Sequence, residues 1–224
     1  MKEPFIITEH EYTIPDDIRI WAKERNIPMI NTVLDFTKID ASYIVEYSPD
    51  ISLSYLDMIY CHAYDKPATI GVTDRLIIRE IWYEDLSAFM ELIKKYPDTI
   101  KHRDMLNISE KKFTERHKAY IRYSYHFLEY GLWGLFLKSS PSGLIGVAGI
   151  DGTEEKELSY ALFPSFEGNG YAQEACNYIL KFSKEYLDIK EIAVNIHSSN
   201  IRSLNLAEKL KDSYPDLKIN IYHS

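Results

Sequence analysis

The sequence predicts an α+β fold, in which a mixed, mostly antiparallel central sheet is flanked by helices and preceded by a small α/β extension. Three strand-like segments follow one another with only turn residues between them, which indicates an antiparallel meander. A strand, a glycine-containing loop, a long helix and another strand come next, and this order implies a right-handed crossover. The N-terminal residues 1–72 alternate strand-like and helix-like segments and form a separate pattern.

The composition is that of a globular protein. Of the 224 residues, 46% are hydrophobic and 27% are charged, so the chain can bury a core. The net charge of −8 argues against a nucleic-acid partner and mildly favours a cationic substrate such as an amine. The two cysteines, Cys61 and Cys176, lack metal-ligand spacing, which predicts reduced thiols in the cytoplasm and no metal. We expect neither a signal peptide nor a membrane span, because no apolar segment approaches ~20 residues.

Residues 1–72 are expected to form the small α/β extension, whose role the sequence leaves unknown. The pattern predicts strands over 5–8, 27–33 and 41–47, a helix beginning near Pro15, and a helix capped by Ser52 that runs to about residue 64. Residues 66–71 contain Pro and Gly and are expected to be a linker. The neighbouring Cys61 and His62 are interpreted as packing residues.

A second pattern fills residues 73–224. It predicts a strand over 75–82, a helix over 85–93 and a helix over 110–130 that Gly131 ends. The meander follows, with strands over 132–138, 144–150 and 157–163 and a hairpin turn over 139–143. An irregular loop at 164–170 leads to a helix over 171–186, a strand over 192–197, a helix over 200–211 and a last strand over 217–222.

The sharpest feature is the segment 167–172, Glu-Gly-Asn-Gly-Tyr-Ala, between a strand and a helix. Two glycines let the backbone turn tightly and leave its N–H groups accessible, and the helix N-terminus adds partial positive charge. This arrangement suits a phosphate or pyrophosphate, although an ordinary tight turn remains the alternative. The chain carries neither a Gly-Lys-Ser/Thr phosphate loop nor a complete GxGxxG dinucleotide motif.

Three segments of the chain resemble motifs of the GNAT N-acetyltransferases and follow one another in the order found in that family. Residues 157–175 are similar to the acetyl-CoA motif, residues 200–210 to the next motif, and residues 73–80 to the first strand of the branch that acetylates ribosomal-protein N-termini. The resemblance covers about 74–211 and implies an acetyltransferase domain over 73–224. It implies an enzyme, an acyltransferase that moves the acetyl group of acetyl-CoA, its co-substrate, to a primary amine.

The resemblance also implies the cofactor contacts. Backbone groups at the end of a strand would pair with the pantetheine arm: Ala161, Leu162 and Phe163. N–H groups of the glycine loop would bind the pyrophosphate: Gly168, Asn169, Gly170, Tyr171 and Ala172. Asn200 would hydrogen-bond the pantetheine amides, a role compatible with capping a helix. Ser203 lies one helical turn later and would hydrogen-bond the thiol sulfur, unless it is simply a neutral helix residue.

Catalysis requires a neutral amine, a polarised carbonyl and a partner for the thiolate. An α-amine with a pKa of ~7.8 is roughly a tenth neutral at pH 7 and needs only a weak, water-relayed base. Glu157 is the candidate base, with a solvated strand-end glutamate as the alternative interpretation, and the N–H of Leu162 is the candidate to polarise the carbonyl. Three histidines are further candidate bases: His117, His126 and His197.

The sequence also departs from the family pattern. Glu167 stands where Gln or Arg usually precedes the glycines. Ala207 stands where many relatives have a tyrosine that acts as the general acid. A single strand is predicted after the last helix, where a hairpin is usual. These departures keep two alternatives open, namely an inactive acyl-CoA-binding regulatory module and an interaction protein whose glycines merely form a turn. The acceptor also stays open between a protein N-terminus, a small amine and an antibiotic. Exposed strand edges favour pairing with another chain, for which a homodimer is one candidate, and the oligomeric state stays open.

Overall fold

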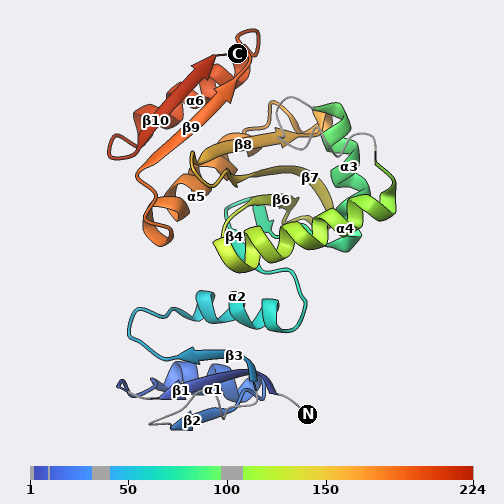
Figure 1. Ribbon diagram of the computed structural model, residues 1–224. Coiled ribbons are helices and arrows are strands. Elements are labelled where there is room, and N and C mark those ends of the chain that lie inside the picture. Colours follow the sequence, from blue (N-terminus) through green and yellow to red (C-terminus); the bar gives the residue numbers. More distant parts are fainter. Residues whose placement is uncertain (1–2, 10, 32–40, 97–107, 224) are drawn as a thin grey trace. The chain divides into compact units, whose positions relative to one another are not determined.

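A computed structural model describes residues 3–9, 11–31, 41–96 and 108–223 of the chain. The chain divides into two units, Met1–Ala68 and Thr69–Ser224 (Figure 1). The division falls four residues earlier than the predicted boundary at 72, because β4 (Thr69–Val72) pairs with β5 (Leu76–Arg79) in the sheet of the second unit. The linker predicted over 66–71 was therefore wrong in its second half.

The described part of the smaller unit contains a parallel sheet in the order β2-β1-β3. Its elements are β1 (Glu3–Glu9), α1 (Asp16–Glu24), β2 (Met29–Asn31), β3 (Ala41–Glu46) and α2 (Leu53–Ala63). The side chains of Phe5 and Ile7 on β1 are fully buried in one apolar cluster with Trp21 of α1 and Leu56 of α2. Alternate residues of a strand share a face, so both helices pack on the same face of this sheet.

Local signals in the smaller unit were interpreted correctly. The hydroxyl of Ser52 accepts a hydrogen bond from the Tyr55 N–H at 3.2 Å and caps α2 as predicted. Asp16 and Asp17 begin α1 directly after Pro15, where acidic side chains favour the helix N-terminus. Of the strand predicted over 27–33, residues 32–33 lie outside the described residues.

In the larger unit, the described strands form one sheet in the order β10-β9-β8-β7-β6-β5-β4 (Figure 1). Its remaining strands are β6 (Leu132–Leu137), β7 (Ser140–Asp151), β8 (Glu157–Leu162), β9 (Glu191–Ile196) and β10 (Lys218–His223). Its helices are α3 (Leu86–Lys95), α4 (Glu110–Tyr120), α5 (Tyr171–Tyr186) and α6 (Ile201–Ser213). Pairing is antiparallel from β4 to β8 and parallel from β8 to β10, which confirms the predicted meander and crossover.

The two faces of this sheet carry different helices. Leu135 and Ala148 point to one face and share a buried cluster with Ile179 of α5. Phe136 and Val147 point to the other face, where their cluster includes residues of α3 and α4. The alternation of strand side chains therefore supplies two apolar layers, and the site described below lies where β8 and α5 meet α6.

Two sequence expectations near β6 were wrong. The helix predicted over 110–130 continues beyond α4 as a π-helix, η4 (Ile121–Leu128), and Glu129, at φ 60°, ends it in place of Gly131. A Cβ at Gly131 would lie 2.7 Å from the Tyr120 hydroxyl oxygen, so this glycine permits close packing. The hairpin turn predicted over 139–143 is the shorter turn 138–139, and an irregular register between β6 and β7 absorbs the extra residues.

The strand predicted over 75–82 is also shorter than expected. β5 ends at Arg79, and the chain then enters a 3₁₀ turn, η2 (Tyr83–Asp85). Asp85 accepts hydrogen bonds from the guanidinium of Arg79 at 2.7 and 2.9 Å and from the Trp82 N–H at 2.8 Å. These buried contacts bend the chain away from the sheet. None of the helices within the described ranges is long and apolar enough to cross a membrane.

Candidate functional site

The larger unit has an opening between two neighbouring strands. β8 and β9 pair through Glu157 and Ala193, where the Ala193 N–H donates to the Lys156 carbonyl at 2.7 Å. The described residues show no further register pair between these strands. On the opposite edge of β8, the Phe163 N–H donates to the Ile145 carbonyl of β7 at 3.0 Å. Backbone groups alternate between edges in an antiparallel ladder, so the Leu162 N–H points toward β9 and into the opening.

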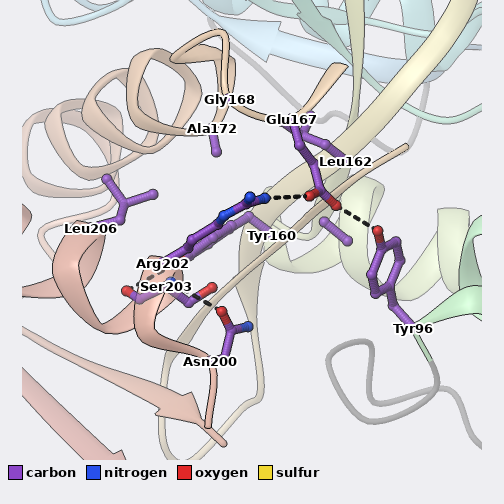
Figure 2. Close-up of a pocket in the computed structure, with 11 residues that line it drawn as sticks. Tyr96, Tyr160, Leu162, Glu167, Gly168, Ala172, Asn200, Arg202, Ser203 and Leu206 are labelled. Carbon is purple, nitrogen blue, oxygen red and sulfur yellow. Dashed lines mark hydrogen bonds and ion pairs between the residues drawn. The ribbon is translucent and has the colours of Figure 1, made fainter. Parts of the chain in front are cut away.

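A pocket lies along β8 at the end that is not paired with β9 (Figure 2). Its lining comes from β8, the glycine loop with the start of α5, the start of α6 and the end of α3: Tyr160, Ala161, Leu162, Glu167, Gly168, Ala172, Asn200, Arg202, Ser203, Leu206 and Tyr96. Six residues predicted for the cofactor thus line one pocket. The other predicted contacts do not line it and belong to the same loop and its flanks: Phe163, Asn169, Gly170 and Tyr171.

The glycine loop has the geometry that its sequence predicts. After a short 3₁₀ turn, η5 (Pro164–Phe166), both Gly168 and Gly170 adopt left-handed backbone, at φ 78° and 80°. A Cβ at Gly168 would meet no heavy atom within 4 Å, so the approach to this residue is open. Gly170 caps α5 without a side-chain hydrogen bond, which leaves the first N–H groups of a 16-residue helix for an anionic ligand.

The loop is held in place by the turn between β4 and β5. The Glu174 carboxylate of α5 accepts hydrogen bonds from the Thr73 hydroxyl at 2.6 Å and from the backbone and side chain of Arg75 at 2.9 and 2.6 Å. The same arginine donates to the Asn169 carbonyl at 2.8 Å. Burial alone would raise the pKa of Glu174, but these donors lower it.

The start of α6 forms the opposite wall. The Asn200 side-chain oxygen accepts a hydrogen bond from the Ser203 N–H at 3.2 Å, so Asn200 has the capping role and still lines the pocket. The Ser203 carbonyl accepts a hydrogen bond from the Tyr160 hydroxyl at 3.3 Å. Burial raises the pKa of Tyr160, which therefore stays protonated at neutral pH.

Glu157 lies apart from the cofactor-lining residues. Its side chain is buried, with 4% of the residue exposed, and accepts a hydrogen bond from the Asn195 amide of β9 at 2.8 Å. It is not a solvated strand-end glutamate. It lies four positions before Ala161 on the same face of β8, about 13 Å along a strand. The structure thus places the candidate base at the paired end of β8 and the cofactor residues at its open end.

The remaining candidate residues differ in their surroundings. His117 is buried in α4 with its Nε2 2.8 Å from the Ile81 carbonyl oxygen, which is a structural position. His197 is exposed, and its Nδ1 lies 2.8 Å from the Ser199 hydroxyl. His126 belongs to η4 and does not line the pocket. Ala207 is fully buried in α6 and offers no acid there.

Several polar residues of the site were not predicted from the sequence. The Glu167 carboxylate accepts hydrogen bonds from the Tyr96 hydroxyl at 2.6 Å and from Arg202 at 3.1 Å (Figure 2). Burial, together with this hydrogen bond, raises the pKa of Tyr96 to about 12. Asn195 carried a usable signal, because it interrupts the apolar run between Ile192 and Ile196. Tyr96 and Arg202 carried none, since only the fold brings them to Glu167.

The described residues contain no group of three or more His, Cys, Asp or Glu side chains that could hold a metal ion. The described residues that line the pocket offer backbone groups, hydroxyls, one amide, one guanidinium and one carboxylate.

Comparison with known proteins places the fold. The family model of the acetyltransferase (GNAT) domain matches residues 75–211, more than half of the chain. An acetyltransferase structure from Agrobacterium tumefaciens C58 is 23% identical with a TM-score of 0.51, over 62% of this chain and 81% of its own. A GnaT-family acetyltransferase from Bordetella pertussis is 22% identical with a TM-score of 0.52, over 62% and 86%.

A third similar structure is RimL, described as a ribosomal L7/L12 α-N-protein acetyltransferase in complex with coenzyme A. It is 17% identical with a TM-score of 0.52, over 63% of this chain and 81% of its own. No curated protein matches the chain. At these identities the structural similarity shows the fold alone. The family match covers the strand, the glycine loop and the helices that build the pocket. The chain belongs to the GNAT acetyltransferase family.

Proposed function

We propose that this protein is an acetyl-CoA-dependent N-acetyltransferase that moves an acetyl group to a primary amine by direct transfer in a ternary complex. The observation that carries the proposal is the pocket along the end of β8 that is not paired with β9, with the glycine loop at one wall and the start of α6 at the other. GNAT acetyltransferases use acetyl-CoA as co-substrate, and a pocket of this construction suits its extended arm.

Candidate partners can be named for the pantetheine arm and for the diphosphate of the cofactor. The pantetheine arm would add to the open edge of β8 as an extra strand, pairing with backbone at Ala161, Leu162 and Phe163. The diphosphate would accept hydrogen bonds from the N–H groups of the glycine loop: Gly168, Asn169, Gly170, Tyr171 and Ala172. The Asn200 amide donates to no described residue and would bind a pantetheine carbonyl.

The reaction itself is an acyl transfer. The amine nitrogen attacks the thioester carbonyl carbon and forms a C–N bond, and the C–S bond then breaks to release CoA thiolate. The proton lost by the amine passes through water to Glu157, and the thiolate takes up a proton from water while the Ser203 hydroxyl hydrogen-bonds its sulfur. The Leu162 N–H, which points into the opening, would stabilise the negative charge on the carbonyl oxygen.

The acceptor is proposed to be an α-amine, either of a protein N-terminus or of a small molecule. Such an amine is roughly a tenth neutral at pH 7, whereas a lysine side chain with a pKa of ~10.4 is almost fully charged. Glu157, which is buried beside Asn195, would serve as the weak base that receives the proton of the amine through water. We also propose a cytoplasmic location, because Cys61 and Cys176 are both free thiols.

Ligand binding and turnover test the proposal separately. Thermal unfolding is followed with acetyl-CoA, CoA and ATP, and CoA release is then measured with a thiol reagent across N-terminal peptides, polyamines and lysine peptides. We expect acetyl-CoA and CoA, but not ATP, to raise the melting temperature, and N-terminal peptides to give the fastest thiol release. Binding without turnover would favour the inactive regulatory module. Absence of any shift would reject the proposed function.

A further inference from the structure

We propose that Arg202 binds a phosphate group of coenzyme A and that Glu167 and Tyr96 position it at the mouth of the pocket. The inference deepens the proposed function, because it requires the pocket to be a CoA site. Among the described residues that line the pocket, Arg202 is the one cation and Glu167 the one anion.

Arg202 has donors available for a ligand. It is the second residue of α6, and its side chain is 84% exposed. Its Nη1 lies 3.1 Å from Glu167, and the described residues offer its guanidinium no other acceptor. A guanidinium carries five N–H donors in a planar fork that matches phosphate oxygens. Arg202 can therefore keep its bond to Glu167 and still bind a phosphate.

Glu167 would otherwise work against an anionic ligand. Its carboxylate directly precedes Gly168, whose N–H is proposed to face the cofactor diphosphate, and like charges repel there. The hydrogen bonds from Tyr96 and Arg202 occupy both carboxylate oxygens, one each. In Figure 2 these three side chains form a continuous chain of contacts beside Tyr160 and Gly168. The carboxylate thus aims the guanidinium, and the guanidinium compensates the carboxylate.

A second carboxylate–arginine pair beside the same loop shows how a pair that stabilises the fold differs from one that is available to a ligand. Glu174 is mostly buried, with 17% of its side chain exposed, and takes three hydrogen bonds from Thr73 and Arg75. Glu167 and Arg202 share a single contact at the surface. A surface ion pair of this kind adds little to fold stability. Its position at the pocket mouth therefore fits ligand recognition better than structural support.

Three ligands and one substitution test this role. Dissociation constants of CoA, dephospho-CoA and pantetheine are measured by calorimetry for the full-length protein and for Arg202→Gln. Loss of a charged hydrogen bond to phosphate is expected to weaken CoA binding by about tenfold, while pantetheine, which has no phosphate, binds both proteins equally. A loss retained with dephospho-CoA assigns the diphosphate, and a loss confined to CoA assigns the 3′-phosphate.

Lys211→Gln supplies the matched control. Lys211 is an exposed cation of the same helix, outside the pocket, so this variant has the same change in net charge. We expect CoA affinity to change by less than about twofold in this variant. Melting temperatures without ligand should be equal for the three proteins, which separates binding from folding.

The role of Glu167 is tested in the double variant. In Glu167→Gln, the Arg202→Gln change should cost only about threefold in CoA affinity, because no uncompensated carboxylate then faces the phosphate. An equal tenfold loss in both backgrounds would reject the positioning role. CoA affinity that is unchanged in Arg202→Gln, or a loss equally large for pantetheine, would overturn the proposal for Arg202. Failure of the unmodified protein to bind CoA would instead reject the proposed function and this inference together.

Discussion

The two edges of β8 are built differently, although they belong to one six-residue strand. Toward β7 the ladder runs continuously from Asp151↔Glu157 to Gly146↔Leu162. Toward β9 the described pairing is confined to Glu157 and Ala193. The same strand is thus part of the core on one edge and part of the pocket on the other. The site arises where regular pairing stops and backbone donors and acceptors become available.

Glycines on the two sides show the same contrast. A Cβ at Gly146, on the paired side, would lie 2.4 Å from the Ala161 carbonyl oxygen, so close packing requires glycine there. A Cβ at Gly168, on the open side, would meet nothing within 4 Å. There the residue supplies a left-handed turn and an unobstructed approach. Glycine substitutions on the paired side should therefore affect stability, and those on the open side mainly ligand binding and turnover.

The largest expected effect is on the paired side, in Gly149→Ala. The added Cβ would lie 2.0 Å from the Gly131 carbonyl oxygen and 2.7 Å from the Leu132 Cα, both backbone atoms that can yield only by separating β6 from β7. We expect the free energy of unfolding in urea to fall by about 3 kcal/mol or more. Gly143→Ala, in the same strand with nothing within 4 Å, should change it by less than about 0.5 kcal/mol. Equal stability of the two variants would contradict this account of the β6–β7 packing.

The second largest effect is expected at the paired end of β8, in Glu157→Gln. If Glu157 is the base, kcat should fall by about 100-fold, because a Gln side chain cannot accept the proton of the amine. The CoA dissociation constant should stay constant, because Glu157 does not line the pocket. Glu154→Gln, an exposed residue of the preceding turn, serves as the control. Undiminished turnover with intact acetyl-CoA binding would eliminate Glu157 as the base.

Much of the larger unit could be predicted because its signals are local. The helix over 171–186 was predicted with the observed bounds, since a glycine pair precedes it and its apolar residues recur at helical spacing. β4 was missed because its evidence is tertiary. Gly71 resembles a linker glycine, yet a Cβ there would lie 2.0 Å from the Tyr178 ring, and the Tyr178 hydroxyl donates to the Ile70 carbonyl at 2.7 Å.

The residues of the site were likewise predictable only where their signals are local. Gly168 and Asn200 could be predicted from turn and capping chemistry, which neighbouring residues define. The contacts of Glu167 could not be read from the sequence, because Tyr96 lies 71 residues before it and Arg202 lies 35 residues after it. From the sequence alone, Glu167 is only a departure from the usual Gln or Arg, and its partners are found only in the fold.

A smaller effect is expected where the loop is held, in Glu174→Gln. The pKa of Glu174 is lowered in the folded state, so its contribution to stability is present above the usual pKa of a glutamate and is lost as the pH falls through the folded value. We expect the substitution to cost about 1–2 kcal/mol at pH 7 and progressively less in acid. Urea unfolding from pH 7 to pH 3 measures this. Glu185→Gln, whose surface pair with Lys181 is 4.0 Å long, should cost under about 0.5 kcal/mol at every pH.

The smallest effect is expected on the open side, in Ser203→Ala. The contacts of Ser203 with Asn200 and Tyr160 use its backbone N–H and carbonyl, so the substitution should leave the helix cap and the pocket wall intact. If the hydroxyl assists the departing thiolate, kcat should fall by about threefold with an unchanged acetyl-CoA dissociation constant. Ser213→Ala, at the far end of the same helix, is the matched control. A loss larger than that of Glu157→Gln would reverse the comparison, because the open edge of the site would then depend on a side chain of α6 more than on the backbone of β8.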